Sequence, residues 1–158
     1  MRIAKFGLTA VAAVLVVLAL AWPTKAQNPG PVRVSFNEQT FNMCTGEIVA
    51  ISGEARSDVF VHFDASGGAH ATIHETITGT AVGMTSGNQY VFHTEISTEE
   101  NVNFGNNQQD EATIIADADL ISQGSLPNER ATITTHETID ANGNITSLDL
   151  DVTDNCNG

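Results

Sequence analysis

Lysine is absent from the chain after residue 25, and this absence limits the partners that the protein can have. Residues 27–158 keep three arginines, Arg33, Arg56 and Arg130, against 19 acidic residues, so their formal charge is −16. A surface this acidic repels nucleic acid and anionic membranes. It is compatible with solubility alone, and it leaves cations or basic partners as the charged species that can bind.

Amphipathic helical stripes and the local motifs of well-known enzyme classes are also missing. Helix-forming residues are scarce after residue 31, while Thr, Val and Ile are plentiful. The chain has no Gly-rich phosphate loop after a strand, no nucleophile elbow and no helical metal motif. These absences leave the chain without a complete catalytic constellation.

Cysteine is limited to Cys44 and Cys156, which lack the CxxC spacing of a metal or redox pair. Two cysteines in an exported chain usually pair with each other. The sequence therefore predicts a Cys44–Cys156 disulfide that brings both ends of the domain together. In the chain-entropy model, a bridge over a loop of about 110 residues adds roughly 4–5 kcal/mol of stability, less any strain.

The one long hydrophobic run, Phe6–Ala21, follows a basic start and precedes small residues at a cleavage site after Ala26. This pattern is typical of a secretory signal peptide, with a cut after Ala21 as the alternative. The run is shorter than the ~20 residues of a membrane-spanning helix, which argues against an uncleaved anchor. We expect a secreted protein, extracellular or periplasmic, with no stable membrane anchor after cleavage. Its expected parts are a signal peptide (1–26), a flexible spacer (27–31) and a single β-domain (32–158).

Short alternating runs bounded by turn residues fill the rest of the chain, as expected for β-strands. Gly79 is either a break between two of these strands or a kink within one. The strands are predicted over Val32–Phe41, Glu47–Ala55, Val59–Asp64, Ala69–Thr78, Thr80–Met84, Gln89–Ser97, Ala112–Ile121, Arg130–Asp140 and Ile145–Thr153.

The hairpin order of these strands indicates an all-β fold, an antiparallel meander of about eight strands. The predicted disulfide ties the first strand region to the last. A sheet whose two ends meet is a closed barrel, or a sandwich near to one. We favour the closed barrel over the sandwich because closure removes exposed edge strands.

The final hairpin has the best-determined register. A two-residue type I′ turn at Asn142-Gly143 pairs Ala141 with Asn144. This register places His136 opposite Asp149 on one face. On the other face it gathers apolar side chains that we expect to be buried, namely Ile133, Ile139, Leu148, Leu150 and Val152.

Glu75 and Glu137 are candidate catalytic residues because each lies on a strand face that is otherwise apolar. Inside a barrel, burial would raise the carboxyl pKa into a range that suits acid–base chemistry. At the barrel mouth the same carboxylates would simply be solvated.

Histidines and one aspartate are candidate ligands for a divalent metal. If Asp64 pairs with His70, then Asp64 shares one face with His62, His70 and His74, and these residues form a zinc or copper patch. A turn like that of the final hairpin would instead put His62 on the opposite face, and the sequence leaves both registers open. His136 and Asp149 are either a metal or pH-responsive site or an ordinary exposed pair.

These residues predict an exported acidic β-domain that is non-catalytic and binds a small ligand, a surface or a partner. The alternative is an enzyme with an acid–base or metal site inside, or at the mouth of, a β-barrel. No cofactor is required by any motif, and a divalent metal is the one that the histidines could hold.

Overall fold

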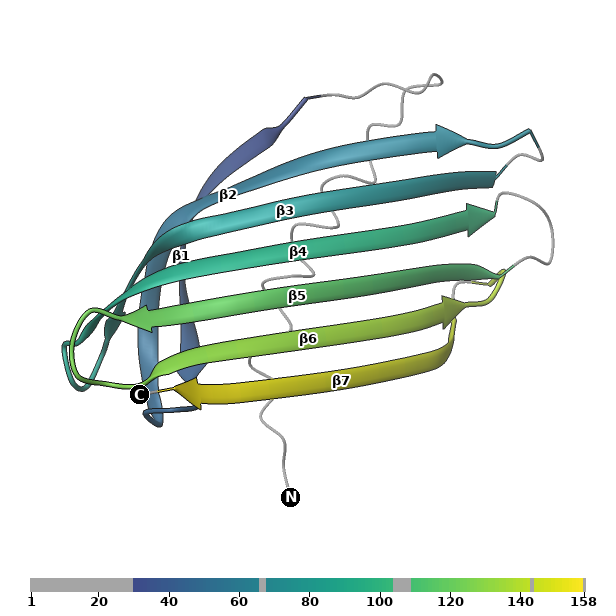
Figure 1. Ribbon diagram of the computed structural model, residues 1–158. Helices are drawn as coiled ribbons and strands as arrows, with labels where there is room; N and C mark the ends of the chain where they lie inside the picture. Colours follow the sequence, from purple (N-terminus) through teal and green to yellow (C-terminus); the bar gives the residue numbers. More distant parts are fainter. Residues whose placement is uncertain (1–29, 66–67, 104–108, 143, 158) are drawn as a thin grey trace.

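The computed structural model describes residues 30–65, 68–103, 109–142 and 144–157, which form one antiparallel sheet of seven strands (Figure 1). The strands follow each other in chain order across the sheet, which confirms the all-β meander. The predicted signal peptide lies outside the described residues, among which no helix is long and apolar enough to cross a membrane. The strands are β1 (Val32–Asn42), β2 (Glu47–Phe63), β3 (Gly68–Gly83), β4 (Gln89–Asn103), β5 (Asp110–Ser122), β6 (Asn128–Ile139) and β7 (Ile145–Asn157).

Two pairs of predicted strands are single long strands in the structure. The stretch Arg56–Asp58 interrupts the apolar pattern of β2, but Arg56 and Asp58 form an ion pair of 3.1 Å on one face while Ser57 is buried on the other. Gly79 is a position within β3 rather than a break. Polar residues and a glycine in mid-strand therefore produced two false boundaries.

Gly79 stands beside Gly53 of β2 at a close approach of two backbones. A Cβ atom added to Gly53 would lie 2.1 Å from the carbonyl oxygen of Thr78, so only glycine fits there. Phe36 and Phe92 are the cross-strand neighbours of the two glycines and pack against the hydrophobic core. Their rings provide the apolar packing that the glycines lack.

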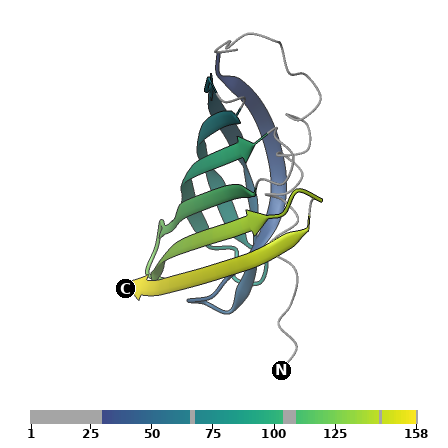
Figure 2. The ribbon, with the colours of Figure 1, turned by 90° about the vertical axis from the view of Figure 1, so that its right-hand side faces the viewer.

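The sheet is strongly curved, with β1 and the first part of β2 lying behind the later strands in Figure 1 and facing them across the concave side in Figure 2. The core occupies one end of this concave face. Because side chains alternate between faces along a strand, the ladder register assigns every residue to the concave or the outer face. The buried core consists of Val49, Ile51, Ala81, Tyr90 and Leu120.

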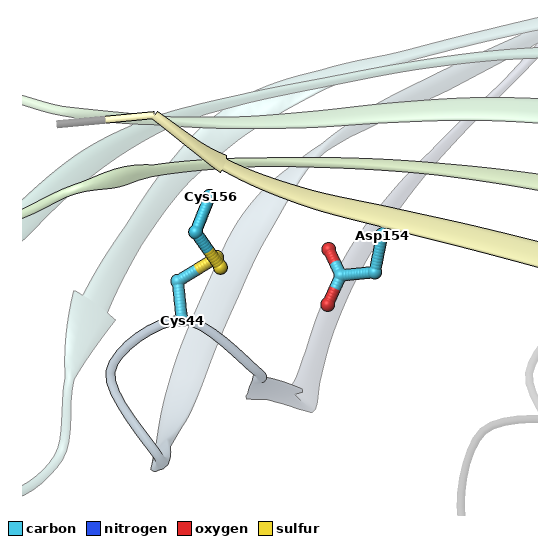
Figure 3. A group of neighbouring side chains, drawn as sticks. All are labelled: Cys44, Asp154 and Cys156. Atoms are coloured by element: carbon cyan, nitrogen blue, oxygen red, sulfur yellow. A yellow bond between two sulfur atoms is a disulfide. The ribbon is translucent and has the colours of Figure 1, made fainter.

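The same end is closed by the Cys44–Cys156 disulfide, which confirms the predicted pairing (Figure 3). The two Cα atoms are 5.5 Å apart, so the β1–β2 turn lies against the end of β7. We call this region the disulfide end of the sheet.

Glu47 holds the β3–β4 turn onto the disulfide end. Its carboxylate accepts hydrogen bonds from the Ser86 hydroxyl (2.8 Å), the Ser86 amide (3.1 Å) and the Tyr90 hydroxyl (3.3 Å). The bonds from Ser86, first the one from its side chain, lower the pKa of Glu47 below its usual value. A carboxylate with so many donors is a structural anchor rather than a reactive group.

The predicted closed barrel is not formed, because β1 and β7 are the two outer strands and are not hydrogen-bonded to each other. Six successive antiparallel pairings make β7 run in the same direction as β1. Direct closure would need a parallel ladder, whereas up-and-down barrels close antiparallel with an even number of strands. An odd strand count therefore leaves two free edges.

The final hairpin has the predicted pairing over most of its length, including His136 with Asp149 and Thr135 with Leu150. Its closing pair was predicted wrongly: the Asp140 amide donates to the Asn144 carbonyl oxygen (2.8 Å), and a β-bulge beside Ile139 restores the register. Gly143, and with it the predicted turn type, lies outside the described residues.

Burial of the final hairpin was also predicted wrongly. Leu148, Leu150 and Val152 lie on the concave face as expected, but 59%, 51% and 57% of their surfaces are exposed. The reason is their place in the fold, since β7 is an edge strand and nothing among the described residues covers its concave side.

Candidate functional site

Charge is divided unequally between the two faces of the sheet. All three arginines of the described residues and all five histidines lie on the outer face. The charged side chains on the concave face are all acidic, namely Glu38, Glu47, Glu75, Glu100, Asp110, Glu129, Glu137 and Asp154. An apolar face whose charges are all negative attracts a cation that has apolar surface of its own.

Glu75 lies near the middle of this face, between its cross-strand partners Ser57 and Ile96. Its neighbours along β3 on the same face are Ile73 and Ile77. Burial among these groups raises the pKa of Glu75 above its usual value. The sequence-based placement of this carboxyl group on an apolar face agrees with the structure, while its catalytic role stays a prediction.

Glu137 lies on β6, and the structure brings Glu100 of β4 into its neighbourhood. Both are cross-strand partners of the buried Ala112, on opposite sides of it. Burial raises the pKa of Glu100, and the nearby charges of Glu137 and Asp110 raise it further. We call this group of three carboxylates around Ala112 the acidic cluster; it marks the open end of the concave face, opposite the disulfide end.

The two predicted catalytic residues do not belong to one acid–base pair. Glu75 lies in the ladder row that contains Ile133 of β6, and Glu137 is four residues further along that strand. With three strand spacings between β3 and β6, the two residues are about 20 Å apart along the sheet. Paired carboxylates in glycosidases are separated by roughly 5–9.5 Å, so Glu75 and Glu137 cannot cooperate in that way.

Thr94 adds an unsatisfied polar atom to the floor of the concave face. Only 6% of the residue is exposed, and its Oγ1 atom has no hydrogen-bond partner in the described part of the chain. Thr94 precedes Ile96, the cross-strand partner of Glu75, by two positions on the same face. The Thr94 hydroxyl is therefore a buried diagonal neighbour of the desolvated Glu75 carboxyl group, and it is covered rather than open to a ligand.

The predicted histidine patch lies on the outer face, and its members share that face. His62 and His70 are direct cross-strand partners, while Asp64 pairs with Gly68 rather than with His70. His70 Nε2 is 3.7 Å from a carboxylate oxygen of Asp64, and its other ring nitrogen contacts Asn101. His74 packs edge-on against Phe60, with ring centroids 6.3 Å apart.

The structure does not assemble these histidines into a preformed metal site. Within the described ranges, the group of three potential ligands whose atoms lie within 4.8 Å of one another is Cys44, Asp154 and Cys156 (Figure 3). Both sulfur atoms of that group are joined in the disulfide, so neither is a thiolate ligand.

His136 and Asp149 lie opposite each other on the outer face, as the register required. Both are exposed, and the Nδ1 atom of His136 is 3.0 Å from the Thr113 hydroxyl on the other side. The arrangement has the features of an exposed cross-strand pair, for which energetic contributions are small. Its metal-binding or pH-sensing role stays a prediction.

Glu100 and Thr94 were missed from the sequence. Glu100 lies beyond Ser97, where the predicted strand ended, so its face could not be assigned. Thr94 alternates with apolar residues like any strand threonine, and only its burial without a partner distinguishes it.

Comparisons of this chain with protein-family models, with curated proteins and with solved structures found no match.

Proposed function

We propose that this protein is an exported, non-catalytic binding domain whose concave face takes a ligand with an apolar body and a positively charged group. The observation that carries the proposal is the division of charge: the concave face is apolar and bears only carboxylates, while the described cations are on the outer face. A disulfide and a predicted signal peptide support export.

The energetics of the carboxylates favour a cationic ligand. Burial raises the pKa values of Glu75 and Glu100, which means that their charged forms are poorly solvated. A bound ammonium group would stabilise those charged forms and would be attracted by several carboxylates at once. An anionic ligand would increase the repulsion that already exists within the acidic cluster.

Apolar surface for the rest of the ligand is available beside the acidic cluster. Leu148, Leu150 and Val152 of β7 are more than half exposed on the concave side, and Ile133 of β6 lies next to them. Covering such surface releases about 25 cal/mol for each Å² of apolar area removed from water. A ligand that places its charge near Glu100 and its apolar part along β7 gains both electrostatic attraction and burial of apolar surface.

Titration with octylammonium and octyl sulfate, two short amphiphiles with the same apolar chain, tests the proposal directly. Octylammonium, well below its micellar concentration, should raise the melting temperature of the protein, because a ligand of the folded state stabilises it. Octyl sulfate should not. A larger stabilisation by the sulfate would contradict the proposed charge preference.

Glu100→Gln is the variant that identifies the site, and Glu99→Gln is its matched control. The two residues are adjacent on β4, but Glu99 is exposed on the outer face. Glu100→Gln should weaken octylammonium binding by about tenfold, equivalent to ~1.4 kcal/mol, while Glu99→Gln should leave it nearly unchanged. Equal losses in both variants would indicate an effect of net charge rather than a site.

A second candidate function is the binding of a divalent metal on the outer face. The observation that favours it is the direct cross-strand pairing of His62 and His70, with Asp64 3.7 Å from His70. Imidazole and carboxylate ligands suit zinc and copper. A zinc-induced rise in melting temperature that disappears in His62→Ala but persists in His93→Ala would support this function; equal responses in the two variants would refute it.

A further inference from the structure

We propose that the free edge of β7 binds an extended polypeptide with alternating apolar and basic residues, which adds to the sheet as an eighth strand. This inference goes beyond the proposed function: the apolar residues of the added strand would lie on the concave side, whereas its basic residues would face Asp149 and Asp151 on the outer side. Three features of β7 carry it: the polarity of the strand, the free backbone edge and the alternation of its side chains.

The directions of the outer strands determine which direction an added strand would have. β1 and β7 are its two outer strands and run in the same direction, so they cannot close antiparallel with each other. One additional strand, running opposite to both, would be antiparallel to β7 on one side and to β1 on the other. The count would then be eight, as in small up-and-down barrels.

The backbone of β7 supplies the means of attachment. It pairs with β6 on one side, and on the other side every second residue presents an N–H and a C=O group that has no strand partner among the described residues. Such an edge binds extended peptides through main-chain hydrogen bonds, and side chains then select the sequence.

The side chains of β7 specify an alternating partner. On the concave side, Leu148, Leu150 and Val152 lie at every second position and are exposed. Residues placed opposite them would be apolar. Cross-strand pairs of apolar side chains stabilise a sheet in this way.

On the outer side, the two positions of β7 between these apolar residues are acidic. Asp149 and Asp151 are exposed there, opposite His136 and Thr134 of β6. Residues of an added strand that faced these carboxylates would be lysine or arginine. The outer face of β1 has a different charge pattern, since its Arg33 forms an ion pair with Glu54. Charge complementarity therefore favours a basic partner at β7.

A second copy of this chain fits the edge less well. A chain with a formal charge of −16 over residues 27–158 repels its copies, and β7 presents the same two aspartates to a second β7. The disulfide also sets a limit, because it holds the β1–β2 turn against the end of β7. The added strand consequently enters from the open end and stops short of Cys156.

The experiment uses a labelled synthetic peptide of alternating valine and lysine, followed by fluorescence anisotropy and by amide hydrogen exchange of the protein. Peptide binding should slow exchange of the amides of β7 that face the free edge, and those of the β5 interior should not change. The same peptide N-methylated at alternate residues keeps its charge but loses its main-chain donors. It should bind at least about tenfold more weakly.

Two pairs of charge-removing substitutions separate the edge from general electrostatics. Asp149→Asn with Asp151→Asn should weaken peptide binding by about tenfold, whereas Glu99→Gln with Glu111→Gln removes the same charge from the outer face of β4 and β5 and should have little effect. Equal losses in the two double variants would overturn the assignment to β7.

The combined results for octylammonium and the peptide separate this inference from the proposed function. Binding of octylammonium without binding of the peptide would overturn the strand-addition inference and leave the proposed function standing. Binding of neither would overturn both. Protection of the edge-facing β7 amides in the protein without peptide, or association that increases with protein concentration, would show that the edge is occupied by this chain or by a second copy. Either result would also overturn the inference.

Discussion

Two carboxylates at opposite ends of the concave face, Glu47 and Glu100, are in opposite environments. At the disulfide end, Glu47 is buried and satisfied by Ser86 and Tyr90, which lowers its pKa and fixes a turn. At the open end, Glu100 is desolvated beside Glu137 and Asp110, and its pKa is raised. The same residue type is thus an anchor where donors surround it and a desolvated group beside like charges where they do not. The core and the disulfide lie at the end of Glu47, and we propose that the ligand binds toward the end of Glu100.

Removing the disulfide should cause the largest loss of stability at the disulfide end. The bond links residues separated by 112 positions in the sequence. Replacing both Cys44 and Cys156 by serine should lower the free energy of unfolding by about 4–5 kcal/mol in the chain-entropy model. Urea denaturation of the oxidised protein and of the double variant measures the difference. A loss below ~1 kcal/mol would show that the disulfide end does not depend on its covalent link.

Two leucine truncations compare packing at a buried and an exposed position. Leu120 belongs to the core with 5% of its surface exposed, whereas 51% of Leu150 is exposed. Leu120→Ala should cost about 2–5 kcal/mol because it leaves a cavity. Leu150→Ala should cost under ~1 kcal/mol, since surface substitutions perturb stability little. Similar costs from equilibrium unfolding would mean that the concave side of β7 is covered in solution.

Two glutamine substitutions should have opposite signs at neutral pH. The pKa of Glu47 is lowered by folding, so its contribution to stability is present above the ordinary glutamate value and is lost as pH falls through the lowered pKa. Glu47→Gln should therefore destabilise the protein at pH 7, and this difference should shrink in acid. Melting curves between pH 3 and pH 7 measure it.

Glu100 affects the pH dependence of stability in the opposite direction to Glu47. Its pKa is raised by folding, so the charged carboxylate opposes folding at neutral pH, and this penalty is relieved as pH falls through the raised pKa. Glu100→Gln should stabilise the protein at pH 7 by less than ~1 kcal/mol, because the group is partly exposed. The stabilisation should vanish at low pH. A destabilised Glu100→Gln at neutral pH would show that Glu100 has a cationic partner or a donor network like that of Glu47.

The pH dependence of ligand affinity should be the smallest of these effects, and it reports specifically on the carboxylates that bind the cation. If a cation binds near Glu75 and Glu100, affinity should rise with pH through their raised pKa values, because the charged carboxylates bind it best. Calorimetric titration with octylammonium at several pH values measures this. Affinity that does not depend on pH between 4 and 7 would place the ligand away from both residues.

The sequence predicted strand positions and faces well because a period of two is a local signal. The shared face of His70 and His74 follows from that period alone, and His136 opposite Asp149 follows from the period together with the position of the turn. The face of His62 did not follow, because it depends on the register of the hairpin at Asp64, which the sequence left open. The Cys44–Cys156 disulfide followed from the cysteine count. Each of these features depends on residue type and parity rather than on distant packing.

Features that depend on distant contacts were not predictable in the same way. Glu47 receives its donors from a turn 39 residues away, so nothing beside it in the sequence reveals its role as an anchor. Leu150 has the pattern of a core residue, but it is exposed because β7 is an outer strand. Whether the barrel closes depends on the number of strands, and the sequence left that number between eight and nine because Arg56–Asp58 and Gly79 resembled strand boundaries, whereas the structure has seven strands.

Chemical-shift mapping of octylammonium binding tests the central claim most directly, because it reports where on the sheet the cation is held. Amide shifts should be largest at Glu75, Thr94 and Glu100 and along Leu148–Val152, and they should be small at the disulfide end around Glu47 and Tyr90. Shifts concentrated at the disulfide end or over the outer-face aspartates, or the absence of any saturable shift, would contradict the account.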